Sequence, residues 1–417
     1  MTAVDIRTIC EDDIIPWTDA VGIGFLRVPD GAKETREKRI EHWRERADFD
    51  RTRGAFDGGR CVGTFRSFAT GLTVPGGAIV PASAITNVTV SPTHRRQGLL
   101  TELMGLDLAD AAARGESLAI LIAAEYRIYG RFGFGVATEY QKFTLDTLRT
   151  DFVPDAPVEP GARIELAGPE EVVELGPPLH EEFRRLRAGA IERSTLWWQM
   201  YTGVVQPPMS PTPPRFHAVY RDPSGKVAGL VSYRTDDHWD EFVPKVTLTV
   251  DSLLALTPAA EIALWRFCAN VDYVNQVEGP DRSPDELLPL LVQDPRAITT
   301  QSRRDFVWAR ILDVPAAFSA RTYGARDRLV VEVHDDLGYA AGRFAIDGAA
   351  EQARCVPTGD PADLALDVST LGALYLGAGS PVRLAVAGRI SERTPGAAEG
   401  AEALLRTARE PWCPDWF

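Results

Sequence analysis

The stretch of the sequence best suited to chemistry is VTVSPTHRRQGLL, residues 88–100. A β-branched run, typical of a strand, ends at Ser-Pro and is followed by Arg95, Arg96 and Gly98. Residues 99–115 then place apolar side chains three and four positions apart, which predicts an amphipathic helix. Two cations and a glycine therefore stand where a strand leads into the N-terminus of a helix.

This junction has the features of an anion-binding site. The first N–H groups of a helix lack partners within the helix and lie at the positive end of its dipole. Gly98 lets an anion approach the backbone closely, and the guanidinium groups of Arg95 and Arg96 add charge and can bind a phosphate through two hydrogen bonds. A bound pyrophosphate would account for every residue of the stretch. A basic helix start with two solvated arginines is the alternative.

Two other kinds of phosphate loop are excluded by their spacing. The chain has no GxxxxGK[ST] sequence, and the glycines of GRFGFG, residues 130–135, have the spacing GxxGxG instead of GxGxxG. A nucleotide-binding regulator built on the arginine pair would also need an acidic partner for a ribose or a magnesium ion. The sequence offers none at a suitable spacing.

The elements that must position this junction form an α/β region, which we place at residues 1–150. The sequence predicts a charged helix at 34–49, strands at 60–72 and 78–91, and a buried strand at 117–124. The arginine pair follows the second of these strands directly, so that strand and the helix after it determine where the pair lies.

A second copy of this pattern follows a linker. Residues 151–163 are rich in Pro, Asp and Gly and are interpreted as the linker. Residues 164–300 then repeat the strand and helix order of residues 60–115, in pattern though not in residue identity. A strand at 245–256 there leads into a helix without any Arg-Arg-x-Gly sequence, so the second copy lacks the anion site.

The third region, residues 301–417, combines short strands and a hairpin with a final helix that runs into the tail PWCPDWF. Chains commonly end in frayed polar residues, so an aromatic ending indicates a tail that docks. The tail either reaches a functional site or packs on its own domain or an oligomer interface.

Composition narrows the class of protein. The five cysteines are scattered without a CxxC pair, and no HExxH pattern occurs, so neither disulfides nor a metal site are expected. No apolar run approaches the roughly 20 residues of a membrane span, and no signal peptide is evident, so a cytoplasmic location is expected. The net charge of −14 disfavours nucleic acid and anionic membranes and favours cationic partners.

The opening stretch resembles motif A of GNAT-type acyl-CoA N-acetyltransferases, although Leu100 stands where these have a small residue. THRRQGLL, IYGRFGFG, LDVPAAFSAR, GRFAID, LYLGAG and the final Phe are together similar to the Eis family, over nearly the whole chain and most weakly at 150–240. The resemblance implies an α+β chain: tandem GNAT-like domains, each a mixed sheet with helices, and a C-terminal α/β domain similar to a sterol carrier protein. The second GNAT-like domain would then be a packing partner and not a second enzyme.

The resemblance also implies how acetyl-CoA is bound and used. The backbone of Val88 and Val90 would bond the pantetheine and the thioester, and the diphosphate would lie on Arg95, Arg96, Gly98 and Leu99. These six residues make up the expected coenzyme site, and no metal is implied.

Two residues are implied to move protons. Tyr129, in IYGRFGFG, would protonate the departing thiolate, and the α-carboxylate of Phe417 would accept the proton of the attacking amine. Without the resemblance, a packing role beside Phe132 and Phe134 fits Tyr129 better than an acid role. Tyr126, three residues earlier, would share its face on a short helix, and Tyr129 is chosen because it alone lies in IYGRFGFG.

The acceptor is expected to be a primary amine of a cationic substrate, such as an aminoglycoside, a polyamine or a lysine side chain, attacking directly in a ternary complex. Phe25, Trp43 and Asp415 are candidates for its binding site. For Trp43 the alternative role, anchoring the charged helix to the core, is the favoured one. The resemblance implies a homo-hexamer. A non-catalytic acyl-CoA or lipid-binding protein is the alternative function.

Overall fold

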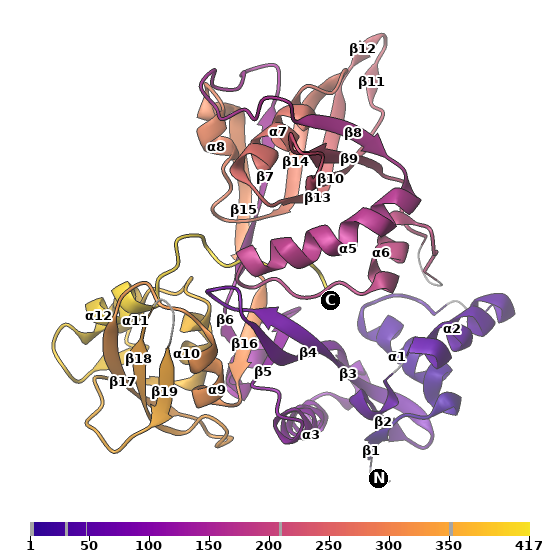
Figure 1. Cartoon of the computed structure of the whole chain (residues 1–417). Coiled ribbons are helices and arrows are strands. Elements are labelled where there is room, and N and C mark those ends of the chain that lie inside the picture. The colour runs from indigo at the N-terminus through magenta and orange to yellow at the C-terminus, as the bar shows by residue number, and fades with distance from the viewer. Residues whose placement is uncertain (1–3, 30–31, 47, 208–210, 350–352) are drawn as a thin grey trace.

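The structure is a computed structural model of the chain, and it describes all residues except 1–3, 30–31, 47, 208–210 and 350–352. Two seven-stranded sheets and one five-stranded sheet, each with its own helices, build three regions (Figure 1). Among the described residues no helix is both long and apolar enough to cross a membrane, and no group of three or more potential metal ligands comes together.

The first sheet carries the arginine pair. Its strands in spatial order are β1 (Asp5–Thr8), β2 (Thr52–Asp57), β3 (Arg60–Thr73), β4 (Ile79–Val90), β5 (Leu118–Ile122), β16 (Val307–Ile311) and β6 (Gly135–Val136). Its helices are α1 (Ile14–Gly24), α2 (Lys33–Arg46), α3 (Leu99–Ala113) and α4 (Tyr126–Tyr129). β3, β4 and α3 begin and end within two residues of the predicted limits, because their periodic apolar patterns are local signals.

The second sheet has the same general order. Its strands are β15 (Ile298–Asp305), β7 (Glu139–Asp146), β14 (Val274–Arg282), β13 (Val246–Ala255), β10 (Val227–Thr235), β9 (Phe216–Arg221) and β8 (Arg163–Ala167). The helices α5 (Pro169–Leu186), α6 (Thr195–Thr202), α7 (Pro258–Ala269) and α8 (Leu288–Leu291) accompany it, and β11 (Trp239–Asp240) pairs with β12 (Val243–Pro244) at one end.

The third sheet comprises β19 (Arg354–Pro357), β18 (Gly342–Gly348), β17 (Asp327–His334), β20 (Leu364–Asp367) and β21 (Ile390–Glu392). The helices α9 (Val314–Ala320), α10 (Val368–Tyr375), α11 (Pro381–Val386) and α12 (Ala397–Leu405) surround it. One continuous hydrophobic core includes strands of this sheet and of the first sheet, so these two regions are packed as a unit.

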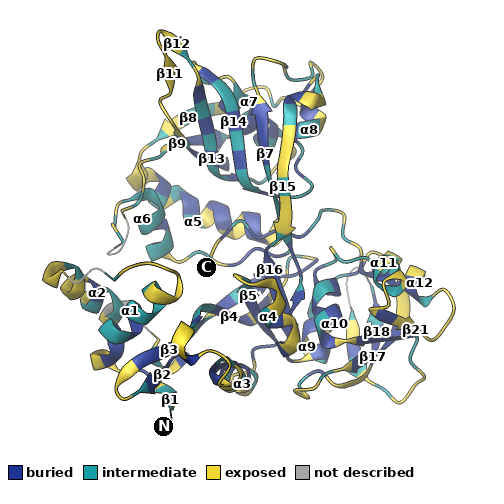
Figure 2. Cartoon of the chain, turned by 180° about the vertical axis from the view of Figure 1, so that it is seen from behind, coloured by how far each residue is buried: buried dark blue, intermediate teal, exposed yellow. Residues whose placement is uncertain are grey.

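The expected boundaries at 150 and 301 do not coincide with the sheets. β7, expected in the first region, pairs with β14 and β15 of the second sheet, and β16, expected in the third, lies between β5 and β6 of the first. β15 runs almost directly into β16, so one extended stretch of chain crosses from the second sheet to the first (Figure 2). Local periodicity predicts strands but not their partners, which is why the exchange was missed.

The expected linker is largely irregular, as its composition indicates. An isolated bridge joins Phe152 to Val292, and β8 begins at Arg163, the last residue assigned to the linker.

Candidate active site

Two neighbouring strands of the first sheet diverge at one end. β5 pairs with β4 in parallel as far as Leu121 opposite Ile85, whereas β4 itself continues to Val90. β3 pairs with the other edge of β4 along this extension. Residues 86–90 of β4 therefore have no strand paired to the edge that faces β5. The backbone donors and acceptors of such an unpaired edge are available to a ligand.

A bulge shapes this edge. Asn87 has a positive φ of 54°, and the pairing of β3 with β4 shifts register between Thr64 and Arg66. The Thr64 hydroxyl donates to the Asn87 carbonyl at 2.7 Å, which holds the bulge from the β3 side. A bulge of this kind turns the strand and redirects its backbone groups.

The splayed edge opens onto a cavity of about 990 Å³. All six residues assigned to the coenzyme site line it, together with Tyr129 and Phe25: Val88, Val90, Arg95, Arg96, Gly98 and Leu99. It is also lined by residues that the sequence did not single out, namely Gly24, Thr89, Pro92, His94, Leu100, Thr101, Ala124, Glu125, Ile128 and Arg131. Ala124 and Glu125 were detectable in principle, because they stand at the exit of a predicted buried strand.

The helix N-terminus at this cavity is uncapped by any side chain. Gly98 is the N-cap of α3, with a φ of +83°, and a Cβ placed on it would have no neighbour within 4 Å. The first-turn N–H groups therefore receive no side-chain cap, and the residues of this turn, 98–101, line the cavity. Arg96 also has a positive φ, 64°, a conformation that a side chain other than glycine adopts only at a cost.

The two arginines differ in their contacts. Arg95 pairs with Glu125 at 3.2 Å, and both side chains are largely exposed. Arg96 is exposed and makes no ion pair within the described part of the chain. An arginine without a protein partner beside an uncapped helix N-terminus is a set of donors suited to a phosphate.

Tyr129 lies at the end of α4 with its ring 6% exposed, 6.3 Å from the Phe134 ring. Burial, and secondarily the charge of Glu125, raise the pKa of Tyr129 to about 12. Its hydroxyl has no hydrogen-bonding partner among the described residues. The phenol therefore keeps its proton at neutral pH and is free to donate it. Tyr126 is 64% exposed and outside this cavity's lining.

The C-terminus reaches the same sheet from its other face. The Phe417 ring packs edge-on against Phe68 of β3, with centroids 5.9 Å apart. Phe68 belongs to the core on one face of the sheet, whereas Phe65 packs with α3 on the other. Figures 1 and 2 both show the end of the chain between the first sheet and the helices α5 and α6. No described cation pairs with the terminal carboxylate.

The structure corrects two expectations about the acceptor site. The Asp415 side chain is 3% exposed and accepts a hydrogen bond from Arg193 Nε at 2.8 Å, so it is not available to a substrate. Trp43 packs against Trp17 with centroids 4.8 Å apart, under the Arg66 guanidinium. This is the anchoring role that was its alternative. Phe25 is 44% exposed at the cavity.

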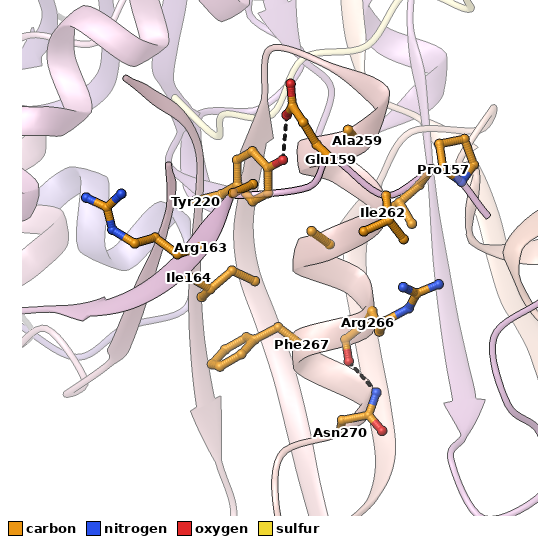
Figure 3. A pocket seen from close by; sticks show the side chains of 13 residues that line it. Pro157, Glu159, Arg163, Ile164, Tyr220, Ala259, Ile262, Arg266, Phe267 and Asn270 are labelled. Atoms are coloured by element: carbon orange, nitrogen blue, oxygen red, sulfur yellow. Dashed lines mark hydrogen bonds between the residues drawn. The ribbon is translucent and has the colours of Figure 1, made fainter. Parts of the chain in front are cut away.

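A second cavity, of about 420 Å³, lies in the second region (Figure 3). Apolar residues of α7 and of the stretch before β8 line most of it, and the Tyr220 hydroxyl donates to Glu159 at 2.7 Å. On the α7 side, the residues that line this cavity run from Ala259 to Asn270, the residue after the helix. The lining contains no arginine pair at a helix start. It therefore does not reproduce the first site.

Family models match all three regions. An "Acetyltransferase (GNAT) domain" matches residues 5–137, a second one matches 189–311, and a "Sterol carrier protein domain" matches 314–414. The expected α+β fold with tandem GNAT domains and a sterol-carrier-like domain is thus confirmed.

Relatives resemble the chain over most or all of its length. An uncharacterized N-acetyltransferase of Streptomyces avermitilis is 49% identical over 417 residues, 99% of each chain. The N-acetyltransferase Eis of Mycobacterium tuberculosis is 33% identical over 342 residues, 81% of each chain. The crystal structure of Eis1 from Mycobacterium abscessus superposes with a TM-score of 0.84 at 32% identity, covering 99% of this chain and 100% of that one. The chain belongs to the Eis family of GNAT-type N-acetyltransferases and is an acyltransferase.

Proposed function

We propose that the chain transfers the acetyl group of acetyl-CoA to a primary amine of a cationic substrate, by direct attack in a ternary complex. The observation that carries the proposal is the single cavity that joins the splayed β4 edge, the uncapped helix start at Gly98 and the buried, protonated Tyr129. GNAT membership makes acetyl-CoA the expected acyl donor.

The cavity offers coenzyme A the contacts that it needs. Its volume of about 990 Å³ suits a large ligand. The N–H groups after Gly98 and the guanidinium of Arg96 would hold the diphosphate, and the backbone at Val88 and Val90 would hold the pantetheine and the thioester oxygen. A backbone donor on that oxygen is worth roughly 3 kcal/mol when charge develops on it.

Acetyl-CoA supplies the activated acetyl group, and the amine nitrogen bonds to its carbonyl carbon while the C–S bond breaks. Tyr129 gives its phenolic proton to the departing sulfur. A phenol of pKa about 12 is a weaker acid than a free thiol, whose pKa is about 8.5. Proton transfer to a free thiolate would be uphill by roughly 5 kcal/mol, so donation must accompany C–S cleavage.

The α-carboxylate of Phe417 would accept the proton that the amine loses, directly or through water. The position of Phe417 supports this role, because the Phe417 ring contacts Phe68 on the face of the sheet opposite α3. An amine approaching from that face and a coenzyme lying beside α3 would meet at the diverging end of β4.

The chemistry of the acceptor is proposed from charge. The net charge of −14 favours polyamines, aminoglycosides or lysine side chains over neutral amines. A hexameric assembly and a cytoplasmic location complete the proposal, on the strength of the family assignment and the sequence.

The test is a thiol-release assay with acetyl-CoA and a panel of these cationic amines, combined with mass spectrometry of the products. We expect amine-dependent release and a mass increase of one or more acetyl groups. Binding of acetyl-CoA without release on any amine would overturn the proposal and restore the non-catalytic binding protein as the better explanation.

A further inference from the structure

The second GNAT domain has a cleft in the same topological place as the cavity of the first. It lies at the end of β13, at the start of α7 and at the end of β14, and its lining there includes Ala255, Thr257, Pro258, Glu261, Arg282 and Glu286. The end of α5 lines it as well. The first cavity is lined by the end of β4, the start of α3 and the residues that follow β5. The remaining space differs: about 110 Å³ in the second cleft against about 990 Å³ in the first.

The chain's own C-terminal segment forms part of the wall of this second cleft. Arg409 and Trp412 line it, and the Trp412 ring is 2% exposed. The guanidinium groups of Arg282 and Arg187 lie over this ring, 5.0 and 5.7 Å from its centroid. The Trp412 backbone N–H donates to the carbonyl of Ala188 at 2.8 Å. An aromatic side chain between two arginines is anchored by both apolar burial and cation–π contacts.

Asp285 holds the start of this segment. Its carboxylate accepts hydrogen bonds from Arg409 Nε at 2.6 Å, from the Glu410 backbone N–H at 3.0 Å and from Arg187 Nη1 at 3.0 Å. Burial opposes its ionisation, but the Arg409 hydrogen bond and the Arg187 charge outweigh burial and lower the pKa of Asp285 to about 2. The carboxylate is therefore charged at neutral pH and joins the second domain to the tail.

Further contacts hold the tail between the Asp285 hydrogen bonds and the end of the chain. Arg193 pairs with Asp415, and both side chains are almost fully buried. The Trp416 indole donates to Asp281 at 3.2 Å, and its ring lies 4.8 Å from that of Phe306. Phe417 follows Trp416 directly, so these contacts restrict the position of the Phe417 carboxylate.

We propose that the second GNAT domain uses its coenzyme-like cleft as a seat for the C-terminal segment, and that Asp285 is a positioning residue for the Phe417 carboxylate. The inference rests on the proposed role of that carboxylate as the base. It gives the second domain a function in the reaction of the first: it fixes the proton acceptor instead of binding a coenzyme. Asp285 acts through the tail and does not touch the substrate.

The test compares Asp285→Asn with a matched control, Asp251→Asn. Asp251 also accepts from two arginines of the second domain, Arg215 and Arg234, but contacts no residue of the tail. We expect Asp285→Asn to lower kcat at least ten-fold with an unchanged KM for acetyl-CoA, and to speed removal of the tail by carboxypeptidase. Asp251→Asn should change neither quantity. Equal kcat for the Asp285 variant and the wild type would overturn the inference.

A second arm separates this inference from the proposed function. A chain shortened to end at Trp416 should lose most of its kcat, and adding Asp285→Asn to it should cause little further loss, because both changes act on one carboxylate. Full activity of the shortened chain would overturn the base role itself. A loss of kcat in the shortened chain without a loss of kcat in Asp285→Asn would overturn only the proposal that the second domain positions the tail. If Asp285→Asn fails to fold, Arg409→Gln removes the same contact from the partly exposed tail side.

Discussion

The two strand-to-helix junctions of this chain share one architecture and differ in how the helix N-terminus is satisfied. At the start of α3, Gly98 offers no side chain to the first N–H groups. At the start of α7, the Thr257 hydroxyl accepts a hydrogen bond from the Ala260 N–H at 3.1 Å, and Pro258 has no N–H to satisfy. The second helix thus needs no anion, whereas the first leaves its donors for a ligand.

The clefts beside the starts of α3 and α7 also differ from each other. The first has a volume of about 990 Å³ and the phenol of Tyr129 at its wall, whereas the second has only about 110 Å³ and is lined in part by Arg409 and Trp412 of the tail. Two domains of the same type therefore differ in what stands beside the helix start: open space in the first and residues of the chain's own C-terminal segment in the second. The fold by itself therefore does not determine whether such a cleft binds a coenzyme.

The largest expected effect comes from the acid of the open cleft. Tyr129→Phe removes the proton donor without changing the shape of the ring, so kcat should fall by about 10²- to 10⁴-fold while acetyl-CoA affinity is retained. Tyr126→Phe is the matched control, since that side chain is exposed and outside the cavity lining. Steady-state kinetics with calorimetry of acetyl-CoA binding would measure both, and unchanged turnover of Tyr129→Phe would remove it from the proton-transfer role.

An intermediate effect is expected at the open junction itself. Gly98→Ala puts a methyl group into the space where the diphosphate would lie and should weaken acetyl-CoA binding about ten-fold, or about 1.4 kcal/mol. Gly115→Ala is the control at the other end of α3, because Gly115 also has a positive φ and no neighbour within 4 Å. Both variants should lose a similar stability of about 1 kcal/mol in thermal unfolding. Equal coenzyme affinity in the two would contradict an anion site at Gly98.

The sequence predicts those features of the two junctions that depend on neighbouring residues, and not those that depend on contacts between distant segments. β3, β4, α3 and the arginine–glycine junction are local patterns, and all were predicted. The absence of an Arg-Arg-x-Gly sequence before α7 also predicted that the second domain lacks the coenzyme loop. The exchange of β7 and β16 between sheets depends on pairing over long separations, which periodicity does not contain.

The tail shows the same limit. Its aromatic residues predicted docking, but the partners could not be read from the tail. The prediction that Asp415 faces a substrate is wrong because its partner Arg193 is far away in the sequence, and the two form a buried ion pair. The contacts of Asp285 could not be predicted for the same reason, since its partners Arg187 and Arg409 come from two other segments.

The smallest expected effect concerns the closed cleft. Burial and the charge of the neighbouring Glu286 raise the pKa of Glu261 well above its ordinary value, so the native state binds a proton there that the unfolded chain releases above about pH 4.5. Its contribution to stability is therefore lost as the pH rises from that value toward the raised pKa. Glu261→Gln keeps a neutral side chain at all pH values.

Chemical unfolding of the wild type and of Glu261→Gln between pH 5 and 8 measures this difference. The variant should become more stable relative to the wild type as the pH rises, by on the order of 1–2 kcal/mol, while acetyl-CoA affinity stays the same. Parallel stability curves would show that Glu261 is ionised in the native state. A change in acetyl-CoA affinity would mean that the second cleft also influences coenzyme binding at the first, beyond the placement of the Phe417 carboxylate that we propose for it.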